Sequence, residues 1–156
     1  METFGSIIDK LCILERRIKE LKSKDESYYF LYEQQGWLIK SLGEVLEQSY
    51  KNQRPFVFKK NKIYDKGTKL EEDVSFLEAI NKLNDCNNKL WELEDVRRDK
   101  SVSDEGRLEA ADQVSLYNKL RNDSIDRIDQ NIERAARLSH PNIFIESREK
   151  ENGNIW

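Results

Sequence analysis

Apolar residues recur at helical spacing in four long segments, and this periodicity constrains the fold more than any other feature of the sequence. In the first segment, about 6–22, they alternate at intervals of four and three, which is the pattern of a helix packed along a narrow seam: Ile7, Leu11, Leu14, Ile18 and Leu21. Comparable rows predict helices at about 25–50, 69–99 and 102–137. The 156 residues include only 6 Gly and 2 Pro, which leaves little room for a sheet-rich fold. We therefore predict an all-α fold, an antiparallel bundle of four to five helices.

Each predicted helix begins with the same signature, a hydroxyl residue followed three positions later by an acid. In a capping box the hydroxyl accepts a hydrogen bond from the first turn, and an acid there is also favoured by the helix dipole. The four pairs are Ser6 with Asp9, Ser23 with Glu26, Thr68 with Glu71, and Ser101 with Asp104.

One long segment, residues 51–67, does not follow a helical pattern. It is bracketed by Pro55 and Gly67 and holds six Lys or Arg and three aromatic residues. The sequence leaves two interpretations open: a basic lip that contacts a phosphate or an acidic partner, or a solvated connection whose aromatic side chains pack onto the bundle. We predict a single domain over residues 1–146, with this long basic and aromatic loop between the second and third helices, and a flexible tail over 147–156.

Composition and charge exclude several classes of function. The net charge of -3 argues against general nucleic-acid binding. No apolar run approaches the roughly 18 residues needed to span a bilayer, and the chain does not begin like a signal peptide, so we expect a cytoplasmic protein without membrane insertion. Cys12 and Cys86 are well separated in helical segments and are predicted to be free thiols.

Several enzyme classes are also excluded. The single histidine, His140, precedes Pro141 near the C-terminal tail, which disfavours Ser-His or Cys-His catalysis and histidine metal sites. No glycine-rich phosphate loop follows a strand, and no βαβ unit supplies a nucleotide-binding sheet.

Polar side chains interrupt the apolar faces of the third and fourth helices. Arg121, for example, stands in the middle of a row of apolar residues. Burying such groups costs several kcal/mol unless they are paired and hydrogen-bonded. We take the polar residues at these positions as candidate ligand-binding residues: Asn87, Trp91, Glu94, Asp95, Arg98, Tyr117, Asn118, Arg121 and Asn122.

Two arrangements of these residues follow from their chemistry. In the first, Glu94 or Asp95 forms a salt bridge with Arg121, and neighbouring Asn and Tyr side chains satisfy the remaining donors and acceptors. In the second, Arg98 and Arg121 bind a phosphate or carboxylate, while aromatic side chains stack on a ring or a sugar. Trp91 and Tyr117 are the candidates for stacking.

A third arrangement is a divalent metal site formed by carboxylates that face each other across the turn between these helices. The carboxylates in question are Glu92, Glu94, Asp95, Asp99, Asp123, Asp126 and Asp129. Oxygen-rich sites of this kind suit Mg²⁺ or Mn²⁺, and helical nucleotide pyrophosphohydrolases use such a scaffold. Their dense Glu-Glu-x-x-Glu run is matched here only by the spacings Glu92 to Asp95 and Asp126 to Asp129.

Two motifs in the third and fourth helices resemble a bacterial family that is catalogued only as a domain of unknown function. The first comprises Asn87, Leu90, Trp91, Glu94, Asp95 and Arg98, and the second comprises Asn118, Arg121, Asn122, Asp123, Ile125, Asp126, Ile128 and Asp129. The opening segment 5–14 is similar to another part of that family. Members are often encoded beside glycosyltransferases in clusters for lipopolysaccharide or other surface glycans, so the resemblance implies a setting rather than a reaction. A His that often follows the Trp is Glu92 here, which removes the most plausible acid/base group.

From these observations we expect an accessory or ligand-binding protein in surface-polysaccharide metabolism that binds a phosphate- or sugar-containing small molecule and needs no cofactor. One alternative is a hydrolase of nucleotides or nucleotide-sugars dependent on Mg²⁺ or Mn²⁺, for which no catalytic residue is identified. The other is a structural module that forms a homo-oligomer through the seam of the first helix.

Overall fold

The computed structural model describes residues 2–21, 26–51 and 74–139, and these residues form four α-helices and no strand. The helices are α1 (Phe4–Glu20), α2 (Glu26–Tyr50), α3 (Phe76–Arg98) and α4 (Asp104–Ser139). The predicted all-α bundle is confirmed. Residues 52–67 of the predicted basic loop, and the tail that was predicted over 147–156, lie outside the described residues.

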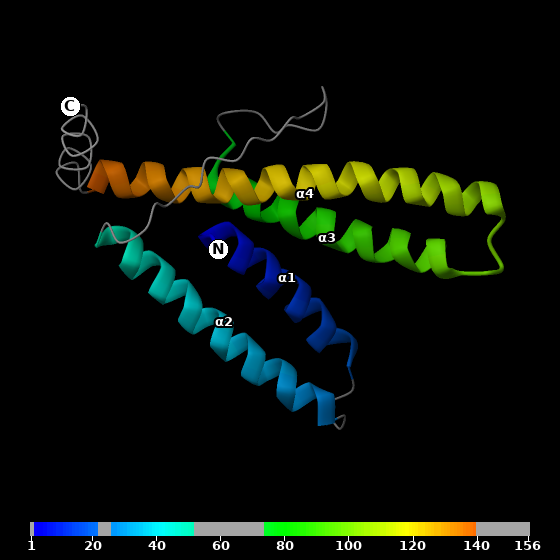
Figure 1. The fold of residues 1–156 in the computed structure, drawn as a ribbon, viewed down its shortest axis with the longest axis horizontal. Coiled ribbons are helices and arrows are strands. Elements are labelled where there is room, and N and C mark those ends of the chain that lie inside the picture. The colour runs from blue at the N-terminus through cyan, green and yellow to red at the C-terminus, as the bar shows by residue number, and fades with distance from the viewer. Residues whose placement is uncertain (1, 22–25, 52–73, 140–156) are drawn as a thin grey trace, which may run out of the picture.

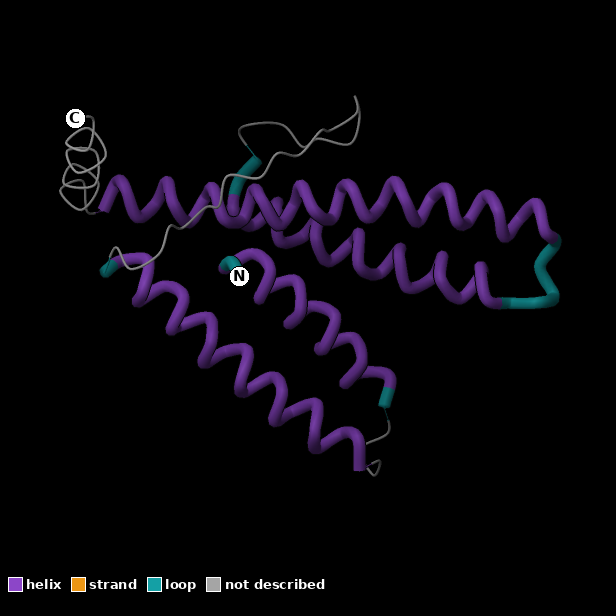
Figure 2. Tube along the Cα trace, in the orientation of Figure 1, coloured by secondary structure: helices purple, strands orange, loops and turns teal. Residues whose placement is uncertain are grey.

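The helices are arranged as two hairpins (Figure 1). α3 and α4 lie side by side and are joined by a tight turn, and α1 and α2 form the second hairpin, which is inclined to the first (Figures 1 and 2). The beginning of α1 and the end of α2 lie close to the α3–α4 hairpin, and the two hairpins diverge towards the connection between α1 and α2. None of the described helices combines the length and the apolar character needed to cross a membrane.

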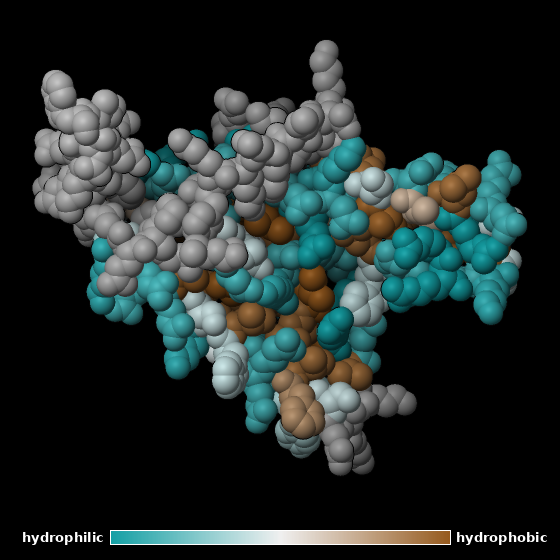
Figure 3. Space-filling model, in the orientation of Figure 1, coloured by the Kyte–Doolittle hydropathy of each residue, from teal (hydrophilic) through white to brown (hydrophobic). Residues whose placement is uncertain are grey.

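The main hydrophobic core lies where the two hairpins approach each other. Its buried residues come from all four helices: Phe4, Ile7, Val45, Ala79, Leu83, Ile125 and Ile128. In the space-filling view, apolar residues gather in the middle of the molecule, whereas much of the outer surface is hydrophilic (Figure 3). Burial of such side chains supplies the main stabilisation of the fold, at about 25 cal/mol per Å² of apolar surface.

A second, smaller apolar cluster lies between α3 and α4, nearer their turn. It consists of Leu90, Leu93, Ala110 and Val114, with Tyr117 packed against it. Along α3 the buried Asn87 stands between the two clusters, and along α4 Arg121 does so. A polar layer therefore separates the two apolar clusters.

The helix starts differ from the predicted ones. The capping box of α1 is formed by Thr3 and Ser6, because the Ser6 amide donates to Thr3 Oγ1 (3.2 Å) and the Thr3 amide donates to Ser6 Oγ (2.8 Å). The predicted pairing of Ser6 with Asp9 is wrong. Because Thr3 and Ser6 cap the helix, the Asp9 carboxylate is available for another partner.

The start of α3 is also displaced along the chain. The capping box of α3 is formed by Ser75 and Glu78, whereas the predicted starts at Ser23 and Thr68 lie outside the described residues. α4 begins at Asp104, with the Gly106 amide donating to Ser103 Oγ (3.2 Å). Ser101, which was predicted to cap this helix, instead donates through its hydroxyl to Asp99 Oδ1 (2.7 Å) in the turn.

Candidate functional site

α1 carries a second row of residues, Gly5, Asp9, Cys12 and Arg16, on the side opposite its apolar seam. These residues also alternate at intervals of four and three, and Asp9 lies about 180° around the helix from Ile7. The row faces the α3–α4 hairpin: Gly5 donates its amide to Asp129 Oδ1 of α4 (2.6 Å), and Arg16 Nη1 donates to Asn88 Oδ1 of α3 (2.7 Å). α1 therefore contacts the α3–α4 hairpin through this face, while its apolar seam lies on the opposite face.

Asp9 is the centre of the polar layer. Its Oδ1 accepts from Arg121 Nε (2.8 Å) and from Asn87 Nδ2 (2.9 Å), and its Oδ2 accepts from the terminal nitrogen Nη2 of Arg121. The two bonds from Arg121 form a bidentate guanidinium–carboxylate pair, which is among the strongest hydrogen-bonded arrangements in proteins. The hydrogen bonds that Arg121 donates to Asp9 raise the pKa of Arg121 above its ordinary value, more than burial lowers it.

The expected salt bridge between Glu94 or Asp95 and Arg121 is therefore wrong. Glu94 Oε2 lies 3.2 Å from Arg97 Nη2 and 3.5 Å from Arg98 Nη2 on its own helix, while Asp95 is exposed. The physical requirement behind the prediction, that Arg121 must find a carboxylate, is met by α1. Asp9 was missed because it was assigned to a helix cap.

A cleft of about 340 Å³ opens beside this polar layer, where α1 diverges from α3 and α4. Seven of the nine predicted ligand-binding residues line it: Asn87, Trp91, Glu94, Asp95, Arg98, Asn118 and Arg121. Leu90 completes the lining from α3, and Ile13 and Arg17 contribute from α1. Tyr117 does not line this cleft but packs against the smaller apolar cluster, and Asn122 is exposed elsewhere.

The cleft brings three guanidinium groups close to an aromatic ring. Arg121 is held by Asp9 and Arg98 lies near Glu94, whereas Arg17 makes no ion pair with any residue in the described ranges. Trp91 also contacts Arg16, whose guanidinium carbon lies 5.3 Å from the ring centroid. Such a cation–π contact orients the indole. The cleft thus combines three guanidinium groups, the carboxylates of Glu94 and Asp95, amide groups and a positioned ring.

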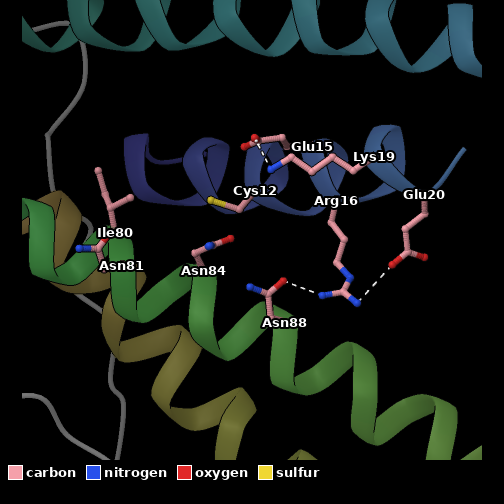
Figure 4. Close-up of a pocket in the computed structure, with 9 residues that line it drawn as sticks. All are labelled: Cys12, Glu15, Arg16, Lys19, Glu20, Ile80, Asn81, Asn84 and Asn88. Carbon is pink, nitrogen blue, oxygen red and sulfur yellow. Dashed lines mark hydrogen bonds and ion pairs between the residues drawn. The ribbon is translucent and has the colours of Figure 1, made fainter. Parts of the chain in front are cut away.

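A second cleft, of about 460 Å³, lies between α1 and α3 (Figure 4). Cys12, Glu15, Arg16, Lys19 and Glu20 line it from α1, and Ile80, Asn81, Asn84 and Asn88 line it from α3. Figure 4 shows Arg16 reaching from α1 to Asn88 and Glu20, so this side chain is held at the boundary of the cleft by two polar contacts.

The carboxylates required for a divalent metal site are not gathered in the part of the chain that the structure describes. No three Asp, Glu, His or Cys side chains of that part are grouped so that they could hold a metal ion. Instead, Glu92 lies beside Lys89, Glu94 beside Arg97 and Arg98, and Asp129 accepts from the Gly5 amide. Their neighbours are cations and backbone donors.

The two cysteines are free thiols, as predicted. Burial, reinforced by the nearby carboxylates of Asp9 and Glu15, raises the pKa of Cys12 from 9.0 to about 11. Burial also raises the pKa of Cys86. Because the thiolate is the nucleophile and the metal ligand, neither thiol is activated for catalysis.

We predict that Cys12 is alkylated slowly by iodoacetamide at pH 8, in a chain carrying Cys86→Ala. The raised pKa lowers the thiolate fraction by about 100-fold, and the higher nucleophilicity of a more basic thiolate recovers about 10-fold, so the rate should fall at least about 10-fold below that of a peptide cysteine. The rate should keep rising with pH to about 11. A rate equal to that of the peptide would contradict the assigned environment.

The same shift implies a pH dependence of stability. The folded state holds the Cys12 proton more tightly than the unfolded chain does, so the contribution of this group to the free energy of unfolding is constant below pH 9.0 and falls as the pH approaches about 11. Between pH 9.0 and about 11, the free energy of unfolding of the variant Cys12→Ala should therefore fall less than that of the parent. Urea unfolding of both proteins at the two ends of this pH range measures the difference.

Comparisons with known proteins bear on α3 and α4. No curated protein and no solved structure matches the chain. The resemblance drawn from the two motifs is supported at the level of a domain of unknown function, because residues 77–148, which span nearly all of α3 and all of α4, match the model of a family described as protein of unknown function (DUF4254).

Proposed function

We propose that this chain binds a small anionic molecule containing a phosphate and a sugar or other ring in the cleft between α1, α3 and α4. The observation that carries the proposal is the convergence of Arg17, Arg98 and Arg121 with Trp91 in one cleft. Guanidinium groups recognise phosphate and carboxylate oxygens, and an indole ring stacks on planar or apolar ring faces. The volume of about 340 Å³ suits a sugar phosphate or a nucleotide.

The three arginines have different roles in this proposal. Arg121 is already paired with Asp9 and forms a fixed wall of the cleft. Arg17 and Arg98 are exposed, and Arg98 shares Glu94 with Arg97, so they can turn towards an anion at little cost. The surface-glycan setting implied by the sequence resemblance is part of the proposal, and it makes sugar phosphates and nucleotide-sugars the first compounds to test.

The test is a thermal-unfolding screen with sugar phosphates, nucleotides and nucleotide-sugars, each with and without Mg²⁺ or Mn²⁺. A ligand at 100 times its Kd adds about 2.7 kcal/mol to the free energy of unfolding, which raises the Tm of a domain of this size by roughly 5–10 °C. Release of phosphate is measured in the same samples, so that turnover is detected directly. If no compound raises the Tm, the proposal fails.

We predict that Arg98→Gln weakens binding of any compound found in this screen by roughly 10- to 100-fold, because one charge-assisted hydrogen bond is lost. Arg97→Gln is the matched control. Arg97 also lies near Glu94, at 3.2 Å, but does not line the cleft. Isothermal titration should show a loss of affinity for Arg98→Gln and little change for Arg97→Gln. Equal losses of affinity in both variants would show that the compound does not bind in this cleft.

A further inference from the structure

A third cleft, of about 270 Å³, lies between α1 and α2, which are neighbours in the structure (Figure 1). We call it the α1–α2 cleft, and we call the cleft of the proposed ligand the arginine cleft. The α1–α2 cleft is lined by four residues of α1 and two of α2: Lys10, Ile13, Leu14, Arg17, Gln34 and Leu38. The four residues of α1 are spaced like neighbours on a helix surface, so they lie on one side of that helix.

The α1–α2 cleft adjoins the arginine cleft. Ile13 and Arg17 line both of them, so the two clefts meet along one flank of α1. Arg17 is exposed, and its guanidinium makes no ion pair within the described ranges. Lys10, the other cation of the α1–α2 cleft, is already paired with Glu2. Arg17 is therefore the cation that can bind an anion at the junction without first releasing a carboxylate.

The floor of the α1–α2 cleft is apolar and its rim is polar. Leu14 is buried, and Ile13 and Leu38 are half-buried. These three side chains present hydrocarbon to the cleft, whereas Lys10 and Gln34 are exposed at its rim. No carboxylate is among the described residues that line it. An apolar lining with a few polar groups is usual for a small-molecule site, and here it favours a hydrocarbon group attached to an anion.

We propose that the ligand of the arginine cleft carries an apolar group that lies in the α1–α2 cleft, and that Arg17 binds the phosphate between this group and the rest of the molecule. A methylene takes up about 30 Å³, much as a water molecule does in the liquid, so a cleft of about 270 Å³ holds roughly six to nine carbons. The ligand is thus an amphiphilic phosphate ester. This inference rests on the proposed function, which it extends to a second cleft.

The first test is isothermal titration of the full chain with n-alkyl phosphates from butyl to octyl, used as monomers below their critical micelle concentrations. Each buried methylene should strengthen binding about two- to fourfold, so octyl phosphate should bind roughly 20- to 250-fold more tightly than butyl phosphate. The gain per carbon should end at about nine carbons, where the cleft is filled. An affinity that does not depend on chain length would overturn the inference.

A neutral amphiphile tests whether the apolar group and the anion are recognised together. Octyl glucoside has the same chain as octyl phosphate but no group that pairs with Arg17. Its affinity should be at least about 10-fold lower than that of octyl phosphate. Equal affinities would show that the α1–α2 cleft takes any hydrocarbon independently of Arg17, which would contradict the proposal.

A substitution that fills the α1–α2 cleft gives a second test. Gln34→Trp places a large ring at the rim of the cleft, so it should weaken the binding of octyl phosphate at least about 10-fold and remove the dependence on chain length. Gly36→Trp is the matched control, because it adds the same ring to the same helix in open space. This control should bind octyl phosphate like the wild type, and circular dichroism checks that both variants remain helical. Equal losses in the two variants would show that the chain does not lie in this cleft.

The role of Arg17 is tested separately from that of the apolar floor. Arg17→Gln should lower the affinity for every alkyl phosphate by a similar factor, roughly 10- to 100-fold, while the gain per methylene persists. Lys19→Gln is the matched control, because it removes the same charge from α1 at a residue that lies beside Glu15 and lines neither of these two clefts. Equal losses in both variants would attribute the effect to net charge and contradict the role of Arg17.

A phosphate with an apolar group can come from a soluble ester or from a membrane lipid. Cosedimentation with vesicles of phosphatidylcholine, with and without phosphatidic acid, tests the second source. Because the cleft lies between two helices, a chain must leave the bilayer to enter it, so we expect binding of the monomers and no sedimentation with either vesicle. Sedimentation together with binding of the monomers would support the cleft and assign its ligand to a lipid. Sedimentation with phosphatidic acid vesicles without binding of monomeric octyl phosphate would overturn the inference.

The failure of this inference can be told apart from the failure of the proposed function. If sugar phosphates or nucleotides raise the Tm but the affinity for alkyl phosphates does not depend on chain length, the proposed function stands and the apolar extension is wrong. If neither group of compounds binds, both are wrong.

Discussion

Arg121→Leu is expected to lower the free energy of unfolding by about 4 kcal/mol, because it leaves the Asp9 carboxylate buried without its cation. The side chain of Asp9 is only 7% exposed, and that of Arg121 is 27% exposed at the cleft. Asp9→Leu should lower the free energy of unfolding by less than Arg121→Leu does, by about 2 kcal/mol, because the remaining guanidinium can turn into the cleft and be solvated there. Urea unfolding followed by circular dichroism measures both changes.

The double variant Asp9→Leu with Arg121→Leu completes this experiment. Two leucines at these positions leave no unpaired charge, so the double variant should be more stable than Arg121→Leu alone, and the coupling energy should be at least about 2 kcal/mol. Asn87 would still lose its acceptor on Asp9, which prevents full recovery. A coupling energy below about 0.5 kcal/mol would show that the pair does not stabilise the polar layer.

Gly5→Ala is expected to destabilise the fold by about 3 kcal/mol, an unusually large effect for one methyl group. A Cβ at this position would lie 2.4 Å from the Ile125 carbonyl oxygen and 3.2 Å from Asp129 Oδ1. The first contact is with backbone, so α1 would have to move away from α4 and lose the hydrogen bond from the Gly5 amide to Asp129. The same unfolding measurement detects this loss.

Gly36→Ala is the control for this prediction. It adds the same methyl group in open space and should raise stability by up to about 1 kcal/mol, through higher helix propensity. If Gly5→Ala were as stable as the parent, the close approach of α1 to α4 would be incorrect.

Local patterns predicted the helices and most of the cleft residues. Periodicity and a shortage of breakers depend only on near neighbours in the chain, so they predicted an all-α bundle with four helices close to the observed ranges. The burial cost of polar groups marked Asn87, Trp91 and Arg121 before any fold was known, and these residues line one cleft. Helix starts were less well predicted, because several hydroxyl residues near each start compete for the same role.

The residues that α1 contributes to the site could not be identified in the same way. Ile13, Arg17 and Asp9 lie far in the sequence from the motifs on α3 and α4, and only the packing of α1 against both brings them there. One signal was present: Gly5, Asp9, Cys12 and Arg16 repeat at heptad spacing opposite the apolar seam. That signal is weak, because a row of one glycine, one acid, one thiol and one cation resembles an ordinary solvated face.

The sequence by itself determined that Arg121 needs an anionic partner, since an arginine within an apolar row is too costly to bury alone. Which carboxylate meets it was decided only by tertiary structure. Glu94 and Asp95 are on the neighbouring helix, but their side chains point towards cations of α3 and towards solvent. Asp9 reaches Arg121 because Gly5 lets α1 pack directly on the backbone of α4 at Ile125. The need for a partner of opposite charge is a property of the buried residue itself. The identity of that partner depends on the rotation and register of helices that are distant in the chain.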